Sequence, residues 1–490
     1  MKNKSPSFVQ QLIHLLLGSG LGLLIGVITT PTITRLVDPE IYGQFSVFKT
    51  YISVAMCFLT LGLDQFFMRY YYVNRETAYR RKLFFITAGI PLLCLVVLSA
   101  VSFLVVFFLK NAGFAIPYHL FLLSVLTLII AVIDRFLLVL LRLQKKTKAY
   151  SALNVVQRLA YLAISVCAVL LLSDNHLVAL VLANAIAPLI TAICAARMVI
   201  SFIRPQKSNI KLGITLKEMV RFSFPVMIAG SVMHVFQALD RLCLNAFTTY
   251  EVVGVYASAQ SLMSVFSVIQ TTFTTVWMPK AIEHYETDSE DKQFYKRVNG
   301  IITVVMYLFA ATVLIGKDLF VLLLGEKYRK AAEIIPFLMF NPIMYTISET
   351  TVMGIFFKKK TGSQVYISTL SALVNLILNL TLIPVLGAKG AAISTGVAYI
   401  MFFTLRTWIA ERHYKVGFDL KHFYIVTGLF VLNATYSMYR GVDAMGLAIN
   451  VLFIVCVCLL YRKYVSDILR LCTSSIKRIL KLRIGESNDG

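Results

Sequence analysis

The most regular feature of the sequence is a succession of long apolar runs separated by short polar segments. A transmembrane α-helix needs about 20 mostly apolar residues to cross the roughly 30 Å hydrocarbon core of a bilayer. About fourteen runs meet this length, at residues 9–34, 41–66, 83–109, 117–141, 150–172, 176–203, 216–245, 252–279, 298–316, 331–357, 364–385, 389–410, 422–439 and 446–461. The pattern therefore predicts an all-α polytopic membrane protein with about fourteen transmembrane helices.

The composition agrees with this pattern and excludes a soluble chain. Apolar residues make up 58% of the sequence and charged residues only 14%, whereas ordinary soluble domains carry about 25% charged residues. The net charge of +23 comes from 47 Lys and Arg against 24 Asp and Glu. A nucleic-acid-binding protein would need a denser basic surface than so few charges provide, so we expect no nucleic-acid partner.

The distribution of the charges predicts the orientation of the chain. An even number of spans with the basic N-terminus inside places both termini in the cytoplasm. With Arg406 counted among them, the expected cytoplasmic segments carry the whole net charge of +23, while the outer segments and the spans each sum to zero. The basic tail at residues 465–490 is typical of an amphipathic helix on the membrane surface, with anionic lipids as its partners.

One short segment of the sequence is repeated. Residues 40–45 (EIYGQF) recur at residues 251–256 (EVVGVY), with glutamate, glycine and an aromatic residue in matching places. Both segments open the second helix of a six-helix unit, as expected for parallel repeats related by an axis along the membrane normal. The repeat predicts two six-helix lobes around a central cavity, two extra helices and a tail, at residues 1–211, 212–412, 413–464 and 465–490.

The same part of the chain resembles a known family. Residues 31–43 (PTITRLVDPEIYG), followed by residues 61–65 (LGLDQ), resemble the opening of the polysaccharide-export branch of the multidrug/oligosaccharidyl-lipid/polysaccharide exporter superfamily. Residues 240–242 (DRL) and 254–256 (GVY) resemble the seventh and eighth helices of that family. The resemblance extends over the whole chain in the number and layout of the spans.

This resemblance implies a function. Members of the branch are flippases that move undecaprenyl-pyrophosphate-linked oligosaccharide units from the inner to the outer leaflet of the bacterial inner membrane, by alternating access between two lobes. It implies lipid-linked oligosaccharide as substrate, and a polysaccharide polymerase and chain-assembly proteins as candidate partners in surface polysaccharide assembly. The two extra helices also occur in the related lipid II flippases, where they flank a groove for the lipid tail.

Six basic residues are the candidate substrate-binding residues, because four lie inside spans and two at the span ends. They are Lys49, Arg135, Arg158 and Arg241 inside the spans, with Arg35 and Arg69 at the outer and inner mouths. A charge at the bilayer centre costs at least about 2.5–3.5 kcal/mol, so each needs a water-filled cavity or a partner. A cationic path of this kind would compensate a pyrophosphate, and arginine adds bidentate hydrogen bonds.

A structural role is the alternative for several of these residues. Arg135 and Arg241 each follow an aspartate in the sequence and are candidates for ion pairs, although neighbours on a helix point about 100° apart. Arg35 and Arg69 are also typical anchors of helix ends. Lys49 and Arg158 have no acidic residue nearby in the sequence, which favours the cavity.

Three acidic residues are the candidates for ion coupling: Asp64, Asp240 and Glu349. A buried carboxylate takes up and releases protons nearer to neutral pH than an exposed one does. Glu349 lies near the middle of its span, whereas Asp64 lies near the cytoplasmic end of its span, where an ion pair with Arg69 is the alternative.

Two other function classes remain to be distinguished. An ion-coupled drug or organic-cation antiporter shares the superfamily and should have a net acidic or aromatic cavity. A membrane enzyme needs a sizeable aqueous face, whereas the loops here are short, and the sequence has no P-loop and no metalloprotease or serine-hydrolase motif. The cysteines are scattered through apolar runs without metal-ligand spacing. We therefore expect a transporter rather than an enzyme, with no cofactor and no metal site.

Overall fold

The structure of the chain is a computed structural model that describes residues 25–26, 28–111, 118–204, 213–360, 362–441, 443–470 and 473. Among these residues, all regular elements are helices. Their bounds are α2 (Pro39–Leu59), α3 (Leu63–Tyr70), α4 (Thr77–Asn111), α5 (Tyr118–Leu143), α6 (Thr147–Leu171), α7 (His176–Met198), α8 (Ile200–Ile203), α9 (Leu216–Phe247), α10 (Tyr250–Met263), α11 (Phe266–Thr287), α12 (Lys292–Val321), the 3-10 helix η1 (Glu326–Tyr328), α13 (Ala331–Leu338), α14 (Phe340–Thr351), α15 (Met353–Phe357), α16 (Gly362–Leu386), α17 (Ala388–His413), α18 (Leu420–Tyr439) and α19 (Ala444–Leu460).

The predicted fold class, an all-α polytopic membrane protein, is confirmed. Within the described residues, nine helices are long and apolar enough to cross a membrane, or up to eleven if each of two bent pairs is one span. The first expected span, at residues 9–34, lies mostly outside the described residues. The eighth expected span is divided between α10 and α11. Helix α18, which corresponds to the expected span at residues 422–439, is not among the nine, because Lys421, His422 and Asn433 lower its mean hydropathy.

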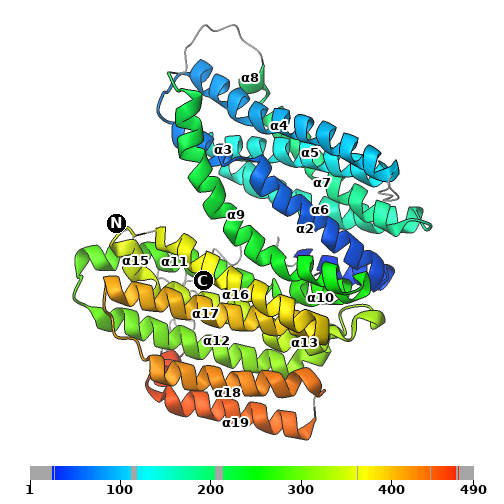
Figure 1. Cartoon of the computed structure of the whole chain (residues 1–490). Coiled ribbons are helices and arrows are strands. Elements are labelled where there is room, and N and C mark those ends of the chain that lie inside the picture. Colours follow the sequence, from blue (N-terminus) through cyan, green and yellow to red (C-terminus); the bar gives the residue numbers. More distant parts are fainter. Residues whose placement is uncertain are drawn as a thin grey trace, which may run out of the picture. The chain divides into compact units, whose positions relative to one another are not determined.

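The helices pack into two compact units (Figure 1). Within the described residues, the N-terminal unit holds the chain up to residue 258 together with residues 324–328, and the C-terminal unit holds residues 259–323 and those from 329 onward. In the C-terminal unit, α12 packs against α18 and α19, which run side by side. The division into lobes at 1–211 and 212–412, the extra helices at 413–464 and the tail at 465–490 stay predictions.

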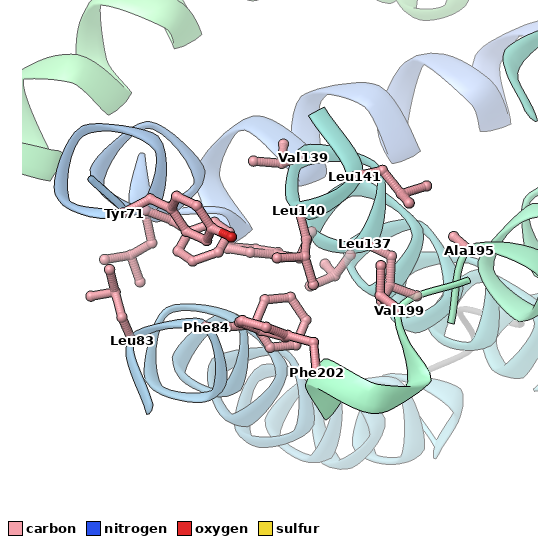
Figure 2. Close-up of a cluster of buried hydrophobic side chains, with 14 of the residues drawn as sticks. Tyr71, Leu83, Phe84, Leu137, Val139, Leu140, Leu141, Ala195, Val199 and Phe202 are labelled. Atoms are coloured by element: carbon pink, nitrogen blue, oxygen red, sulfur yellow. The ribbon is translucent and has the colours of Figure 1, made fainter. Parts of the chain in front are cut away.

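The core of the N-terminal unit holds α3 and α5 in place. Figure 2 shows Phe84 of α4 and Phe202 of α8 pointing toward each other, and their ring centroids are 6.2 Å apart in an edge-to-face arrangement. Phe66 of α3 and Phe136 of α5 are fully buried in the same cluster. Because α3 and α5 carry Asp64 and Arg135, this packing fixes the helices that present two of the candidate site residues.

The second expected span is bent where α2 meets α3. The two helices differ in direction by 48°, and the break contains Leu61 and Gly62 with φ of 50° and 69°. A side chain at residue 62 would also come within 2.5 Å of the Ser223 carbonyl oxygen of α9. Glycine therefore permits both the left-handed backbone and the close approach of α9.

The two copies of the repeated segment pack against each other within the N-terminal unit. A Cβ added at Gly43 of α2 would lie 1.8 Å from the carbonyl oxygen of Tyr250, at the start of α10. A Cβ added at Gly254 of α10 would lie 1.9 Å from the carbonyl oxygen of Pro39, at the start of α2. The contact is reciprocal, so the glycine that recurs in the sequence is required for the two helix starts to cross.

Residues 324–328 complete this part of the N-terminal unit. The Tyr328 hydroxyl donates to the Val37 carbonyl at 2.9 Å, and the Gly325 N–H donates to the Thr34 hydroxyl at 3.3 Å. Lys327 forms an ion pair with Asp38. These contacts explain why a loop from the second half of the sequence belongs to the first unit.

Replacing Gly43 by Ala should destabilise the protein by about 3 kcal/mol, the upper end of the range for overpacked sites, because the clash is with backbone that cannot rotate away. Thermal unfolding of the purified protein in detergent measures the change. Gly89→Ala in α4 is the matched control, since nothing lies within 4 Å of the added Cβ. It should leave stability unchanged or raise it by up to about 1 kcal/mol. Equal melting temperatures for the two variants would contradict the close crossing of α2 and α10 at Gly43.

Candidate functional site

Cationic side chains from several helices lie at the surface of the N-terminal unit. Lys49 of α2, Arg135 of α5 and Arg158 of α6 are exposed there, well inside helices that are long enough to span the membrane. The side chain of Arg135 is 47% exposed. Since a charge that faces lipid near the bilayer centre is costly, these side chains indicate a surface that faces water rather than lipid.

Lys49 and Arg241 lie close together on this surface. The Lys49 ammonium is 5.7 Å from the ring centroids of both Phe45 and Tyr161, and it lies near enough to Arg241 for the two charges to repel. Arg241 of α9 donates from Nη1 to the hydroxyl of Thr50, the residue after Lys49, at 3.3 Å. The structure thus brings together two of the predicted substrate-binding residues.

Arg158 belongs to the same neighbourhood through α6. It precedes Tyr161 by three residues, so the two side chains share a face of that helix. Tyr161 in turn contacts Lys49 of α2. Lys49, Arg158 and Arg241 therefore come from three different helices of one unit, and we call these three residues the cationic group.

Asp64 and Arg135 form an ion pair. Arg135 donates to Asp64 Oδ2 from Nη2 at 2.6 Å and from Nε at 3.0 Å, and the Asp64 side chain is only 4% exposed. The partner of Asp64 is thus Arg135 of α5 and not Arg69, which is exposed at the end of α3. Arg35 is exposed as well, and the roles of Arg35 and Arg69 at the mouths stay predictions.

The acidic neighbours of Arg135 and Arg241 bind other groups. Asp134 accepts hydrogen bonds from the Thr191 hydroxyl at 2.8 Å and from Gln157 at 3.2 Å. Asp240 is buried and accepts a hydrogen bond at 2.7 Å from Tyr256, the aromatic residue of the second repeated segment, and its charge also attracts that of Arg241. Adjacent residues point in different directions on a helix, which is why adjacency in sequence did not reveal these partners.

Glu349 forms an ion pair in the interior of the C-terminal unit. Arg406 of α17 donates from Nη1 to Glu349 Oε1 and to the Ser348 hydroxyl, both at 2.7 Å. The two charged side chains are only 5% and 2% exposed. Whether Glu349, Asp64 or Asp240 couples transport to an ion stays a prediction.

Arg406 is the charged residue that sequence reasoning misplaced. The charge distribution along the sequence places it with the cytoplasmic segments, whereas the structure buries it inside α17 beside Glu349. The corrected assignment adds one positive charge to the spans. Two features of the sequence point to a buried Arg406. It lies within the expected span 389–410, and a carboxylate inside the membrane such as Glu349 requires a basic partner on another helix.

A family model described as "Polysaccharide biosynthesis protein" matches residues 8–281. No curated protein matches the sequence.

Solved structures share the fold. The chain is similar to the lipid II flippase MurJ in an inward closed conformation, with a TM-score of 0.67 and 13% identity, covering 94% of this chain and 100% of that one. It is also similar to the Vibrio cholerae MATE transporter VcmN (TM-score 0.51, 14% identity, 83% and 96% covered). A further match is an inward-facing MATE multidrug resistance transporter of the MOP superfamily (TM-score 0.52, 11% identity, 83% and 98% covered). The resemblance to the exporter superfamily that the sequence predicts is confirmed. Because the solved structures are only 11–14% identical to the chain, they show a shared fold and not a shared substrate.

Proposed function

The chain belongs to the polysaccharide biosynthesis protein family, and from this premise we propose that it is a flippase for lipid-linked oligosaccharides. It moves undecaprenyl-pyrophosphate-linked repeat units from the inner to the outer leaflet of the bacterial inner membrane by alternating access, and it supplies surface polysaccharide assembly. Both termini lie in the cytoplasm. A polymerase and chain-assembly proteins would take up the product on the outer side.

The observation that carries the proposal is the cationic group. Lys49, Arg158 and Arg241 lie inside the N-terminal unit's membrane-spanning helices, and Lys49 and Arg158 are exposed at its surface. Lys49 contacts aromatic rings and forms no ion pair with any residue in the described part of the chain. A pyrophosphate is the part of the proposed substrate that needs such charges, because its own charge must be compensated inside the membrane.

An ion-coupled drug or organic-cation antiporter is the alternative function. The MATE transporters share the fold, but a cationic substrate would be repelled by exposed Lys49 and Arg158. A catalytic role has less support, since the named structural neighbours are a flippase and transporters. The fold alone does not select between the two transport functions.

Deletion of the protein tests the proposal. We expect a lipid-linked oligosaccharide to accumulate on the inner leaflet and the surface polymer to be lost, with both restored by a plasmid copy. Mass spectrometry of extracted lipids identifies the oligosaccharide, and protection from a glycosidase added outside spheroplasts reports the leaflet. Unchanged lipid-linked oligosaccharide together with increased sensitivity to cationic drugs would favour the antiporter instead.

A further inference from the structure

A cavity of about 820 Å³ opens within the C-terminal unit, between α11 and α14. Its volume falls in the range of about 300–1,000 Å³ that is usual for small-molecule sites. Most of its wall is one face of α11, and Tyr345 of α14 closes one side. The wall carries neutral hydrogen-bonding groups from Gln270, Thr271, Thr274, Thr275 and Tyr345, together with the apolar side chains of Met278, Pro279 and Ile282. Its one carboxylate, that of Glu283, forms an ion pair with Lys280.

The two faces of α11 differ in chemistry and in burial. The face that packs into the unit is mostly apolar and buried, and consists of Thr272, Phe273, Val276, Trp277 and Ala281. On the opposite face, Thr271 and Thr275 are exposed, whereas Gln270 and Thr274 are partly buried. This face therefore combines hydroxyl and amide groups with the apolar side chains of Met278, Pro279 and Ile282.

Another helix of the same unit shows what a lipid-facing surface looks like here. The exposed face of α16 carries Leu373, Ile377 and Leu380, which are 49%, 59% and 47% exposed. Aliphatic side chains of this kind suit contact with acyl chains. Unlike this face of α16, the α11 wall places hydroxyl and amide groups among its apolar side chains.

The threonines offer neutral hydrogen-bonding groups at the spacing of a helical turn. The Thr275 hydroxyl donates to the Thr271 carbonyl at 2.7 Å, so its oxygen keeps lone pairs for a ligand donor. The Thr274 hydroxyl oxygen is buried and has no hydrogen-bond partner among the described residues. A buried polar group of this kind calls for a partner, and a ligand hydroxyl would supply one.

Tyr345 supplies a fixed aromatic wall. Its ring stacks on Phe402 with centroids 5.7 Å apart, and the Arg406 guanidinium lies 5.2 Å from the Tyr345 ring centroid. Arg406 is held by its ion pair with Glu349. The Glu349–Arg406 pair therefore positions the ring, which presents a rigid apolar surface beside the polar face of α11.

We propose that this cavity binds the uncharged carbohydrate part of the lipid-linked substrate. Neutral hydroxyl and amide groups beside an aromatic ring match a ligand that has many hydroxyls and an apolar ring face. The inference rests on the proposed function, and it assigns recognition of the sugar to the α11 wall of the C-terminal unit.

The test removes the hydroxyls without changing side-chain shape. In the triple variant Thr271→Val, Thr274→Val, Thr275→Val, binding of lipid-linked oligosaccharide purified from the deletion strain should weaken about ten- to a hundredfold, from the loss of up to three neutral hydrogen bonds. Binding of undecaprenyl pyrophosphate, which lacks the sugar, should change less than about twofold. Native mass spectrometry of the purified full-length protein in detergent measures both affinities.

Thr272→Val is the matched control, because it makes the same change on the buried face of the same helix. It should leave the preference for the oligosaccharide-bearing lipid unchanged. Equal loss for both probes in the triple variant, or no loss for either, would overturn the sugar site while leaving the proposed function intact. If the unaltered protein binds neither probe, the proposed function fails and the sugar site with it.

Discussion

Export of the surface polymer should be abolished when Lys49 or Arg158 is replaced by alanine, although the protein still inserts in the membrane. Each side chain is exposed within a membrane-spanning helix, so its removal takes away charge compensation that a translocating pyrophosphate needs. A hydrogen bond to a charged group contributes about 1.5–3 kcal/mol, which corresponds to a loss of about ten- to more than a hundredfold for each residue. Polymer on the cell surface and lipid-linked oligosaccharide on the inner leaflet are the two quantities to measure.

Charge-retaining variants separate the charge from its geometry. Lys49→Arg should keep most of the export, whereas Arg158→Lys should keep less, because lysine cannot make the bidentate phosphate contact of arginine. Lys415→Ala and Arg75→Ala are matched controls, since both residues are exposed in loops outside the spans. Normal export in both Lys49→Ala and Arg158→Ala would rule out the cationic group as the pyrophosphate site.

Glu349→Gln should lower the stability of the protein by about 3–5 kcal/mol, because it leaves the buried Arg406 charge without its partner. The pair is 2.7 Å long, and both side chains are almost fully buried. Thermal unfolding in detergent measures the loss. Glu290→Gln breaks the exposed Lys292–Glu290 pair and is the matched control, with an expected change of less than about 1 kcal/mol.

The double variant Glu349→Gln, Arg406→Gln should recover part of the loss, because it removes both buried charges. The same pair of variants addresses ion coupling. If Glu349 is a coupling site, transport in Glu349→Gln should lose its dependence on the proton or sodium gradient. If the Glu349→Gln variant is less stable but its transport still depends on the gradient, then Glu349 positions Arg406 and Tyr345 and does not couple transport to an ion.

The polytopic all-α architecture follows from the sequence alone, for a physical reason. In a bilayer, the backbone must satisfy its own hydrogen bonds, so an apolar run of sufficient length has few alternatives to a helix. The expected spans from the second onward coincide with helices or short series of helices, as residues 150–172 and α6 illustrate. The repeated segment was also visible in the sequence, and its glycine proved to mark the crossing of α2 and α10.

The local sequence does not predict where a span is broken into two helices. The break at Leu61 and Gly62 depends on how close α9 comes to α2 and α3. The division of the eighth expected span into α10 and α11 was likewise not predicted. Hydropathy reports the length and polarity of a run, and it carries little information about bends within the run.

The partners of the charged residues were decided by tertiary structure. Asp64 pairs with Arg135, which is 71 residues away, and Glu349 pairs with Arg406, which is 57 residues away. Side-chain direction and helix packing select these partners, and neither can be derived from spacing along one chain.

Residue type and short-range order are enough to predict that the protein lies in a membrane, where its helical spans run and most of the charges that those spans contain. The packing of the helices decides which of those charges form ion pairs and which side chains are exposed, as Asp64 with Arg135 and the exposed Lys49 illustrate. It also decides that one face of α11 lines a cavity, because a stripe of threonines along a helix does not say whether it meets protein or water. Burial and ion pairing are properties of helices packed together, and they determine where this protein can bind a substrate.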